Sequence, residues 1–509
     1  MTIRVFTPET GFVQDMADVL RLFYGGAPIF FNEEGEADLR VEHAVSRQNG
    51  RWCDQFTGGP VSVFHLQGAD GAGELEQKRL RKRAVKLALY EYCKKLTGVH
   101  PPWGSLTGIR PSRLYYEALE EGLDPVRTLV DVFDVTEDRA RLLDEMHGMQ
   151  KGVRTPPEGA FDIYIGIPFC KTRCAYCSFS SGEIGDGHLV APYVDALKRE
   201  IALSAQIVAE KGLRARALYV GGGTPTAIPR EALEEVIFAA REAFPGAVEQ
   251  TVEAGRPDTI DRPMLEMLLR AGTTRISVNP QTFNDETLRR IGRAHTAQET
   301  IAAYQLAREA GFTDINMDLI AALPGETLED FRRTLETTVS LAPESVTVHA
   351  LAIKRSSRLH EQMHVQGGGH GLTPASEAEQ MTALARKTLT AGGWKPYYLY
   401  RQKYMAGNLE NVGNARPGMA CLYNIGNMEE TASVLALGAG AITKWLYDRE
   451  VRAEAEGFDV EAMRFANLQL RIERAPNLKS VEQYIARVDE MAERKRALWA
   501  PRGTKEERA

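Results

Sequence analysis

The chain has 509 residues, 43% hydrophobic and 26% charged, which is the composition of an ordinary globular protein. Its 62 basic and 69 acidic residues give a net charge of −7, so nothing in the overall charge attracts nucleic acid or an anionic membrane. No apolar run approaches the roughly 18 residues of a membrane span, and the start MTIRVFTPETGF lacks a signal-peptide pattern, so we expect a cytoplasmic protein without a membrane span or a nucleic-acid partner.

The N-terminal block, residues 1–152, is predicted to be an α+β domain of unknown role. Residues 37–56 form a hairpin pattern around Asn49–Gly50, because that dipeptide tolerates the positive φ of a tight turn. Residues 73–98 have helical spacing and carry a basic run from Lys78 to Lys86. The simpler interpretation of this run is a solvated helix face, and the alternative is an anion-binding face. The Pro- and Gly-rich stretch at 152–159 cannot continue a helix and marks a boundary.

Residues 160–352 alternate between short apolar strands and amphipathic helices, which is typical of parallel βα units. The expected strands are FDIYIGI, RALYVGG, AVEQTVEA, TRISVNP, DINMDLIAAL and ESVTVHAL. Six units without a seventh predict the α/β class and a partial (β/α)6 barrel. In such folds the chemistry gathers at the carboxyl ends of the strands.

The pattern fades after residue 352, where we expect a C-terminal domain at 353–450 and a helical tail at 451–509. A helix is predicted near 375–391 and a short strand at WKPYYLY, but the extension is expected to be mainly helical. The histidines of the Gly-rich stretch, His360, His364 and His370, are interpreted as incidental.

Three of the six cysteines, Cys170, Cys174 and Cys177, follow the first strand of the alternating region with C-x3-C-x2-C spacing. Thiolates at this spacing commonly hold an iron–sulfur cluster, whereas structural zinc generally takes four ligands. No fourth Cys or His stands at the matching spacing. The residues therefore favour a [4Fe–4S] cluster with one open iron over zinc or a chance grouping. The other three cysteines are scattered and do not form a disulfide framework, which fits a reducing compartment.

Polar or glycine residues stand at the ends of the next four strands. Gly221–Gly222–Gly223 would let a ligand approach the backbone closely, although a tight βα turn alone could explain them. Glu253, Gln281 and Asp318 follow or lie within apolar strands. An acid is costly to bury there unless it binds something, so we expect ligand contacts.

These motifs resemble those of the radical SAM enzymes, whose C-x3-C-x2-C loop holds a cluster that cleaves S-adenosylmethionine (SAM). Within that family, YIGIPFC, GGGTPT, NMDLI and LGAGAI resemble the oxygen-independent coproporphyrinogen III oxidase group. PWGSLTGIRP, VHALAIKRSS, QKYMAGNLENVG and CLYNIGNMEE resemble a long coproporphyrinogen dehydrogenase subgroup, so the resemblance covers nearly the whole chain.

The resemblance implies roles for individual residues. It assigns Cys170, Cys174 and Cys177 to the cluster. The residues implied to contact cluster-bound SAM are Tyr164, Gly222, Glu253 and Ile442. Those matching a second SAM site are Tyr176, Gly223, Thr224, Gln281, Arg293, Asp318 and Ala350. Without the resemblance, Arg293 would be interpreted as a surface arginine.

The resemblance also implies an activity. A 5′-deoxyadenosyl radical would remove hydrogen from substrate propionates, and loss of CO₂ and one electron would leave vinyl groups, giving protoporphyrinogen IX in heme biosynthesis. An electron donor such as flavodoxin or ferredoxin is implied as a partner. Lys354, Arg355 and Arg358 are candidates to bind the substrate carboxylates, or they form an ordinary solvated loop.

Phe179 departs from the family pattern, because the well-known oxidases carry a fourth cysteine there. That cysteine is tied to oxidase activity, and its absence also marks the heme-chaperone relatives. Cys421 could approach the site or be a buried structural thiol, and Cys53 and Cys93 are expected to be inert. Three hypotheses remain: the anaerobic oxidase, a heme-binding or heme-delivery protein, and another radical SAM reaction on a tetrapyrrole, namely methyl transfer or reductive ring opening.

Overall fold

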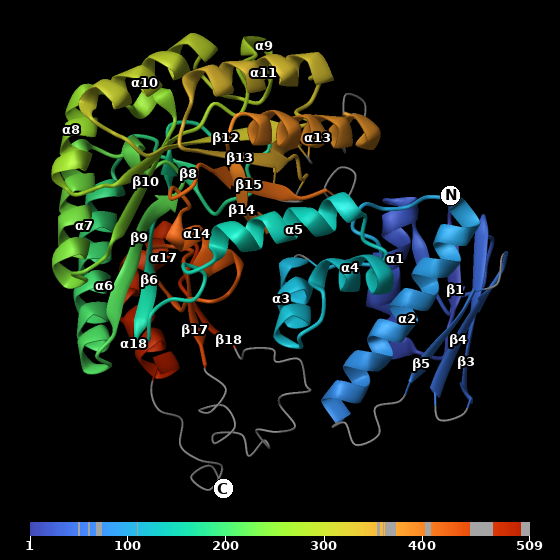
Figure 1. Ribbon diagram of the computed structural model, residues 1–509. Helices are drawn as coiled ribbons and strands as arrows, with labels where there is room; N and C mark the ends of the chain where they lie inside the picture. Colours follow the sequence, from blue (N-terminus) through green and yellow to red (C-terminus); the bar gives the residue numbers. More distant parts are fainter. Residues whose placement is uncertain are drawn as a thin grey trace, which may run out of the picture. The chain divides into compact units, whose positions relative to one another are not determined.

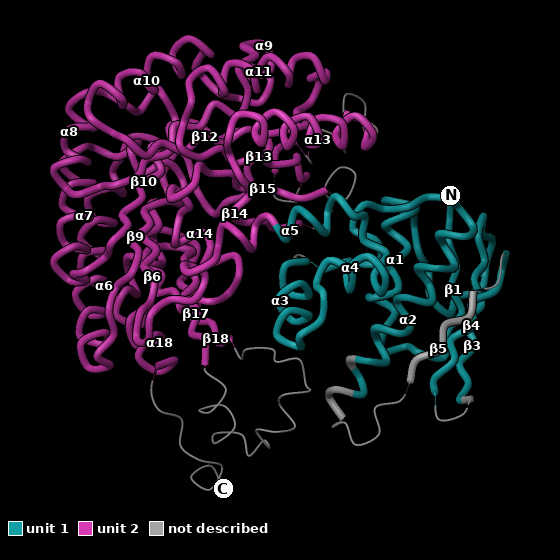
Figure 2. Tube along the Cα trace, in the orientation of Figure 1, with its two compact units in different colours: residues 1–144, 449–469 teal, residues 145–448, 470–509 magenta. Residues whose placement is uncertain are grey.

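The protein is seen in a computed structural model that describes residues 1–48, 51–59, 62–67, 74–108, 110–353, 357–359, 361, 373–402, 409–447 and 472–499. The described residues divide into two compact units, 1–144 and 145–447 with 472–499 (Figure 2). Among these residues, no helix combines the length and the apolar character that crossing a membrane requires.

The first unit is built on a five-stranded mixed sheet in the order β2-β1-β3-β4-β5. The strands are β1 (Ile3–Phe6), β2 (Ile29–Phe31), β3 (Leu39–Gln48), β4 (Arg51–Thr57) and β5 (Ser62–Gln67). The helices are α1 (Val13–Tyr24), α2 (Glu74–Thr97), α3 (Ser112–Glu120), α4 (Pro125–Phe133) and α5 (Glu137–Gln150), of which α5 continues into the second unit.

Both local predictions for this unit are confirmed. β3 and β4 pair antiparallel with Gln48 opposite Arg51, as a hairpin requires; its turn, Asn49–Gly50, lies outside the described residues. The helix predicted at 73–98 is α2. A buried network fastens α2 to the sheet, because the Arg81 guanidinium donates to both Asp54 oxygens at 2.5 Å.

The second unit contains an 11-stranded sheet in the order β14-β15-β13-β12-β11-β10-β9-β6-β16-β17-β18. Its middle holds the six predicted strands, β6 (Ala160–Ile167), β9 (Arg214–Gly222), β10 (Glu249–Gly255), β11 (Arg275–Val278), β12 (Ile315–Ala321) and β13 (Ser345–Ala350). All neighbours within these six are parallel, which confirms the predicted βα alternation.

Helices separate these strands along the chain, and Figure 1 shows α6, α7, α8 and α10 along one face of the sheet. The helices are α6 (Val190–Glu210), α7 (Arg230–Ala243), α8 (Arg262–Arg270), α9 (Asp285–Arg290), α10 (Ala297–Ala310) and α11 (Leu328–Leu341). Capping boxes begin α10 at Thr296 and α11 at Thr327, which satisfies backbone N–H groups at each helix start.

Side-chain alternation gives the sheet two different faces. In β6, Phe161, Ile163 and Ile165 belong to the large apolar core under the helices. Because successive strand residues point to opposite faces, Tyr164 lies on the inner face with Tyr219 of β9 beside it in register. The same alternation puts polar residues of β10, β12 and β13 on the inner face.

The C-terminal extension is mixed rather than mainly helical. It adds β14 (Lys395–Tyr400), β15 (Asn411–Ala415), β16 (Val434–Leu437), β17 (Ile442–Leu446) and β18 (Ile472–Pro476) to the sheet, and the helices α13 (Ala375–Ala391), α14 (Leu422–Met428), α17 (Val481–Ala486) and α18 (Val488–Trp499). β16 pairs parallel with β6, placing Val434 opposite Asp162. The prediction failed because four- and five-residue strands leave too little periodicity to detect.

Candidate functional site

The three clustered cysteines lie in a short loop directly after β6. The loop is closed by a two-stranded pair, β7 (Phe169–Cys170) with β8 (Gly182–Glu183). Cys170, Cys174 and Cys177 are half-buried free thiols. A backbone hydrogen bond of 3.1 Å from Cys177 N to Cys174 O tightens the turn between the second and third. Cys170 thus sits at the carboxyl end of its strand, where the sequence places the chemistry.

Neighbouring segments fix the position of this loop. Ala175 N donates to Ile291 O at 2.9 Å, and Leu359 N donates to Ala175 O at 2.8 Å. The buried guanidinium of Arg256 donates to the Thr172 hydroxyl at 2.6 Å. Three separate segments therefore hold the cysteine loop in one conformation.

The triple glycine at the end of β9 lies against the cysteine loop. A methyl group on Gly223 would stand 2.5 Å from Phe169 O and 3.0 Å from Cys170 Sγ, so no larger residue fits without displacement. Gly222 has a φ of +113°, a conformation that favours glycine. Thr224 N donates to Phe169 O at 2.7 Å, and its hydroxyl lies 3.7 Å from Cys170 Sγ. These glycines are required by packing as well as by any ligand.

Glu253 faces the inner side of the sheet from β10. Its Oε1 accepts a 2.6 Å hydrogen bond from the Tyr219 hydroxyl, and its carboxylate lies against Gly221. Burial, aided by repulsion from Asp318, raises the pKa of Glu253 to about 7, although hydrogen bonds from Tyr219 and the Gly222 backbone oppose the shift. This carboxyl can therefore hold or release a proton near neutral pH.

Asp318 faces the same side from β12. Asn316 Nδ2 donates to its Oδ1 at 2.8 Å, and His349 Nε2 on the next strand lies 4.0 Å from the same oxygen. Burial lowers the pKa of His349, a shift that the nearby Asp318 partly opposes. The inner face thus offers two carboxyl groups together with imidazole and phenol groups.

Gln281 and Arg293 lie near this group and are both buried. Gln281 adopts a φ of +65°, and its backbone is held to β12 by two 2.9 Å bonds, from its N–H to Asp318 O and from Ile320 N to its carbonyl. Arg293 Nη1 donates to Asn279 O at 2.6 Å. Burial alone would lower the pKa of Arg293, but attraction to Tyr176 and Cys174 raises it above its usual value. The surface interpretation of Arg293 is therefore wrong.

The last two predicted residues, Ala350 and Ile442, differ in burial. Ala350 is buried at the end of β13, and its N–H donates to Asn411 Oδ1 at 2.9 Å. Ile442 begins β17 and is 44% exposed. Just before it, the Gly440 backbone approaches Ser180, so that a methyl group on Gly440 would lie 3.4 Å from Ser180 Cβ. Phe179, where the family pattern has a cysteine, is 69% exposed.

Cys421 lies elsewhere. Its thiol is buried and donates to Glu249 Oε1 at 3.2 Å, at the amino end of β10. Cys170, Cys174 and Cys177 follow the carboxyl end of β6, so Cys421 does not approach them and is the buried structural thiol of the two alternatives. Cys53 and Cys93 are also buried.

Of the remaining candidate residues, Arg358 lies within the described part of the chain. Arg358 Nη2 lies 3.2 Å from Glu183 Oε1, and both side chains are about half exposed, at 53% and 47%. Lys354, Arg355, His360, His364 and His370 lie outside the described residues.

Sequence reasoning missed an aromatic layer on the inner face. Tyr164, Tyr219 and Tyr423 stack, with ring centroids of Tyr219 and Tyr423 4.5 Å apart. Tyr219 and His349 could have been found, because each alternates with core residues of its strand and is therefore inward-facing. Tyr423 could not, because it reaches the site from α14.

The residues around the cysteine loop have the chemistry that a cluster with bound SAM would need. Within the described ranges, no three His, Cys, Asp or Glu side chains converge on the position of a single metal ion. A four-iron cluster does not need such convergence, because each of its thiolate ligands binds a different iron. Arg293 Nε and both ring nitrogens of His295 are buried and lack a hydrogen-bond partner among the described residues. Three free thiols beside a glycine cradle and unsatisfied buried donors fit a bound polar cofactor.

Comparison with known proteins gives one family. The model described as the Radical SAM superfamily matches residues 164–338. The oxygen-independent coproporphyrinogen-III oxidase-like protein HemZ of Bacillus subtilis (strain 168) is 35% identical over 452 residues, which covers 86% of this chain and 88% of that protein.

Two further similarities are shorter or more distant. The heme chaperone HemW of the same organism is 31% identical, but the match covers only 46% of this chain and 61% of the chaperone. The solved structure "Coproporphyrinogen III oxidase (HemN) from Escherichia coli is a Radical SAM enzyme" has a TM-score of 0.51 and 24% identity, covering 70% of this chain and 73% of that one. This structural likeness shows the shared mixed α/β fold.

Proposed function

The chain belongs to the radical SAM superfamily and, within it, to the oxygen-independent coproporphyrinogen III oxidase-like group that includes HemZ, and on this premise we propose that it converts two propionate side chains of coproporphyrinogen III to vinyl groups. The product is protoporphyrinogen IX. The observation that carries the proposal is the 35% identity to HemZ over 86% of this chain and 88% of that protein.

The cysteine loop and the glycine cradle are proposed to bind the cofactors. Cys170, Cys174 and Cys177 would hold a [4Fe–4S] cluster and leave one iron open. When bound there with SAM, the reduced cluster supplies a 5′-deoxyadenosyl radical. Glu253, which has a pKa near 7 and accepts a hydrogen bond from Tyr219, would accept a hydrogen bond from the ammonium group of SAM.

The other residues matched by family resemblance are proposed to line the space for a second SAM molecule. Arg293 and Asp318 supply opposite charges, as the amino and carboxyl groups of SAM require. Tyr176 and Gln281 lie next to these charges, since Tyr176 interacts with Arg293 and Gln281 bonds the Asp318 carbonyl. Tyr164 would contact the first SAM from β6.

For this reaction the protein must position the substrate and exclude water from it. Each propionate loses one hydrogen atom, one CO₂ and one electron, so a vinyl group forms and an external acceptor takes the electron. The inner-face tyrosines present a flat apolar surface suited to a tetrapyrrole. The substrate carboxylates need cations, and Arg358 is one candidate beside the cysteine loop through its bond to Glu183.

One anaerobic experiment tests this function. The cluster is reconstituted, reductant, SAM, coproporphyrinogen III and an electron acceptor are added, and the products are analysed by mass spectrometry. We expect loss of two CO₂ per tetrapyrrole and 5′-deoxyadenosine in proportion. SAM cleavage with intact coproporphyrinogen would refute the oxidase and leave methyl transfer or ring opening of a tetrapyrrole.

A second candidate function is heme binding or delivery, and Phe179 is the observation that favours it. The Phe179 side chain is 69% exposed. By family resemblance, the well-known oxidases carry a cysteine at this position. A heme carrier would bind heme one to one and leave coproporphyrinogen unchanged. The Phe179→Cys variant distinguishes the two, because a gain in decarboxylation would show that only the missing thiol limits an oxidase.

A further inference from the structure

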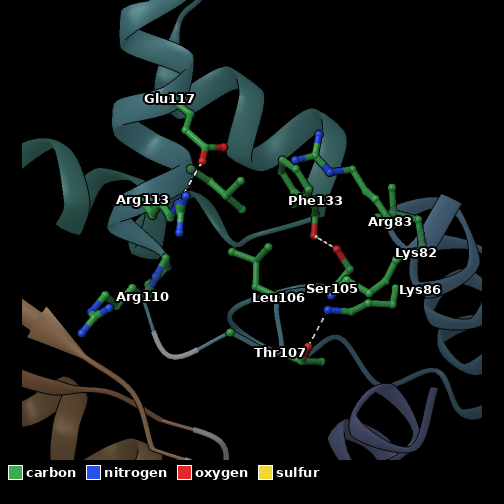
Figure 3. Close-up of a pocket in the computed structure, with 14 residues that line it drawn as sticks. Lys82, Arg83, Lys86, Ser105, Leu106, Thr107, Arg110, Arg113, Glu117 and Phe133 are labelled. Atoms are coloured by element: carbon green, nitrogen blue, oxygen red, sulfur yellow. Dashed lines mark hydrogen bonds and ion pairs between the residues drawn. The ribbon is translucent and has the colours of Figure 1, made fainter. Parts of the chain in front are cut away.

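The N-terminal unit contains a cavity that the proposed function does not use (Figure 3). Its volume is about 320 Å³. It lies between α2 on one side and the loop before α3, with the first turns of that helix, on the other. All the lining residues belong to the first compact unit, so the cavity is a property of this unit.

Basic side chains from both walls meet in this cavity. α2 supplies Lys82, Arg83 and Lys86, and the opposite wall supplies Arg110 and Arg113. Glu117 is the one acidic residue that lines the cavity within the part of the chain described. A chain with a net charge of −7 therefore concentrates five cations in the wall of one cavity, with Glu117 as the acid in that wall and Asp15 of α1 lying 3.7 Å from Lys82.

The basic residues of α2 share one helix face. Lys82 and Lys86 are four positions apart, and Arg83 and Lys86 are three apart, so their like charges repel and weaken the helix. A merely solvated face would point such residues into open water. Here the face borders a cavity whose other wall is also basic, which favours the anion-binding interpretation of the run Lys78–Lys86.

Existing contacts hold several of these groups in place. Lys86 Nζ donates to Thr107 Oγ1 at 2.6 Å across the cavity, and Arg113 Nε donates to Glu117 Oε1 at 3.1 Å. Figure 3 shows both bonds at the cavity wall. The Arg83 guanidinium lies over the Phe133 ring, 5.2 Å from its centroid, which is within the roughly 6 Å of a cation–π contact. A bound anion would thus meet donors that are already oriented.

The chemistry of the walls selects the class of ligand. A carboxylate has two oxygens, whereas a phosphate monoester carries about −1.5 to −2 charge and three acceptor oxygens, which matches several converging cations better. Leu106, Leu114 and Phe133 give the cavity an apolar part as well. The first turn of α3 lines it too, and the positive end of the helix dipole adds to the field.

We propose that this cavity binds a small phosphate ester with a flat apolar body, of which a nucleoside monophosphate is the simplest example. The volume lies at the lower end of small-molecule sites, roughly 300–1,000 Å³, so a ligand of mononucleotide size fits and a tetrapyrrole with all its substituents does not. The site would make the N-terminal unit a sensor or binding module for phosphorylated metabolites, separate from the cysteine loop.

The test is calorimetric titration of the full-length, cluster-loaded protein with UMP and GMP. Saturating SAM is present so that nucleotides cannot report on a SAM site. We expect at least one nucleotide to bind more tightly than uridine, inorganic phosphate or citrate. Its affinity should fall as the salt concentration rises. If neither nucleotide binds with higher affinity than these three comparison compounds, the proposal is wrong.

Variants locate the binding. Lys82→Gln/Arg83→Gln removes two cavity cations and should weaken nucleotide binding roughly tenfold or more, because charge-assisted hydrogen bonds are lost. Lys95→Gln, at an exposed position on the same helix outside the cavity, should bind like the unaltered protein. Arg110→Gln tests the opposite wall should the double variant misfold. Equal binding by Lys95→Gln and the cavity variants would overturn the assignment.

Discussion

Replacing Lys495 by methionine removes the partner of a buried charge in the second unit. Lys495 Nζ on α18 lies 2.6 Å from Glu200 Oε1 on α6, and neither side chain is exposed. Glu200 also accepts hydrogen bonds from Asn477 Nδ2 at 2.8 Å, Tyr484 OH at 2.6 Å and Gly438 N at 2.8 Å. One carboxylate therefore joins α6, α17, α18 and the loop after β16.

The expected cost follows from this environment. Breaking a buried ion pair by removing one partner costs about 3–5 kcal/mol, because an uncompensated charge remains in a medium of low polarity. Three remaining donors to Glu200 place the expected value at the lower end, about 3 kcal/mol. Methionine is close to lysine in length and is flexible, so it leaves little cavity of its own.

A matched control lies one residue away. Arg496 on α18 pairs with Glu210 on α6 at 2.8 Å, but the two side chains are 37% and 55% exposed. Arg496→Met should therefore cost no more than about 1 kcal/mol. Both variants change one cation on α18 that pairs with α6, and they differ in burial.

Hydrogen exchange of peptides from α6 and α18, read by mass spectrometry, measures the effect. This assay is suited to a chain of two compact units, because its unfolding need not be a single transition. We expect faster exchange of α18 in Lys495→Met and nearly unchanged exchange in Arg496→Met. Equal exchange rates in the two variants would refute the reasoning that burial decides the energy of this pair.

Three further predictions concern the candidate site. Since folding raises the pKa of Glu253 from 4.5 to about 7, the apo protein should lose on the order of 3 kcal/mol of stability as pH rises from below 4.5 through 7; urea denaturation across this range should show a smaller loss for Glu253→Gln, and an identical loss would contradict the assignment. Cys174→Ala should abolish iron–sulfur absorbance and SAM cleavage, whereas Cys421→Ala should keep both; surviving cleavage in Cys174→Ala would sink the cluster assignment. Gly223→Ala should lower iron per chain, since the added methyl would stand 3.0 Å from the first cluster thiol, while Gly182→Ala, with nothing within 4 Å of its methyl, should load normally; iron analysis checks this, and equal loading would show that the loop yields freely.

Much of the second unit could be predicted because its signals are local. The strands and helices from 160 to 350 repeat a short apolar pattern, and each pattern is complete within its own segment. The spacing of Cys170, Cys174 and Cys177 likewise lies within eight residues, so a type of site could be predicted before the fold. Glu253 and Asp318 were found by the same route, as acids inside apolar strands.

Other features depend on pairing between distant parts of the chain. β16 lies beside β6 although about 270 residues separate them, and Tyr423 reaches Tyr219 from α14. No local periodicity encodes such pairing, which is why the C-terminal extension was wrongly expected to be mainly helical. The burial of Arg293 and the distance of Cys421 from the cysteine loop also follow from packing alone.

The order of the βα units, the spacing of the cysteine loop and the residue types at the strand ends can be read from the amino-acid sequence, because they depend on local patterns of apolar and polar residues. Which of these residues meet in space depends on folding. Alternation along β9 indicates that Tyr219 faces inward, but its partner is decided only when β9 and β10 pair and bring its hydroxyl to Glu253. The cations of α2 become a cavity wall only when Arg110 and Arg113 face them, since charge gathers in space by folding and not by position along the chain.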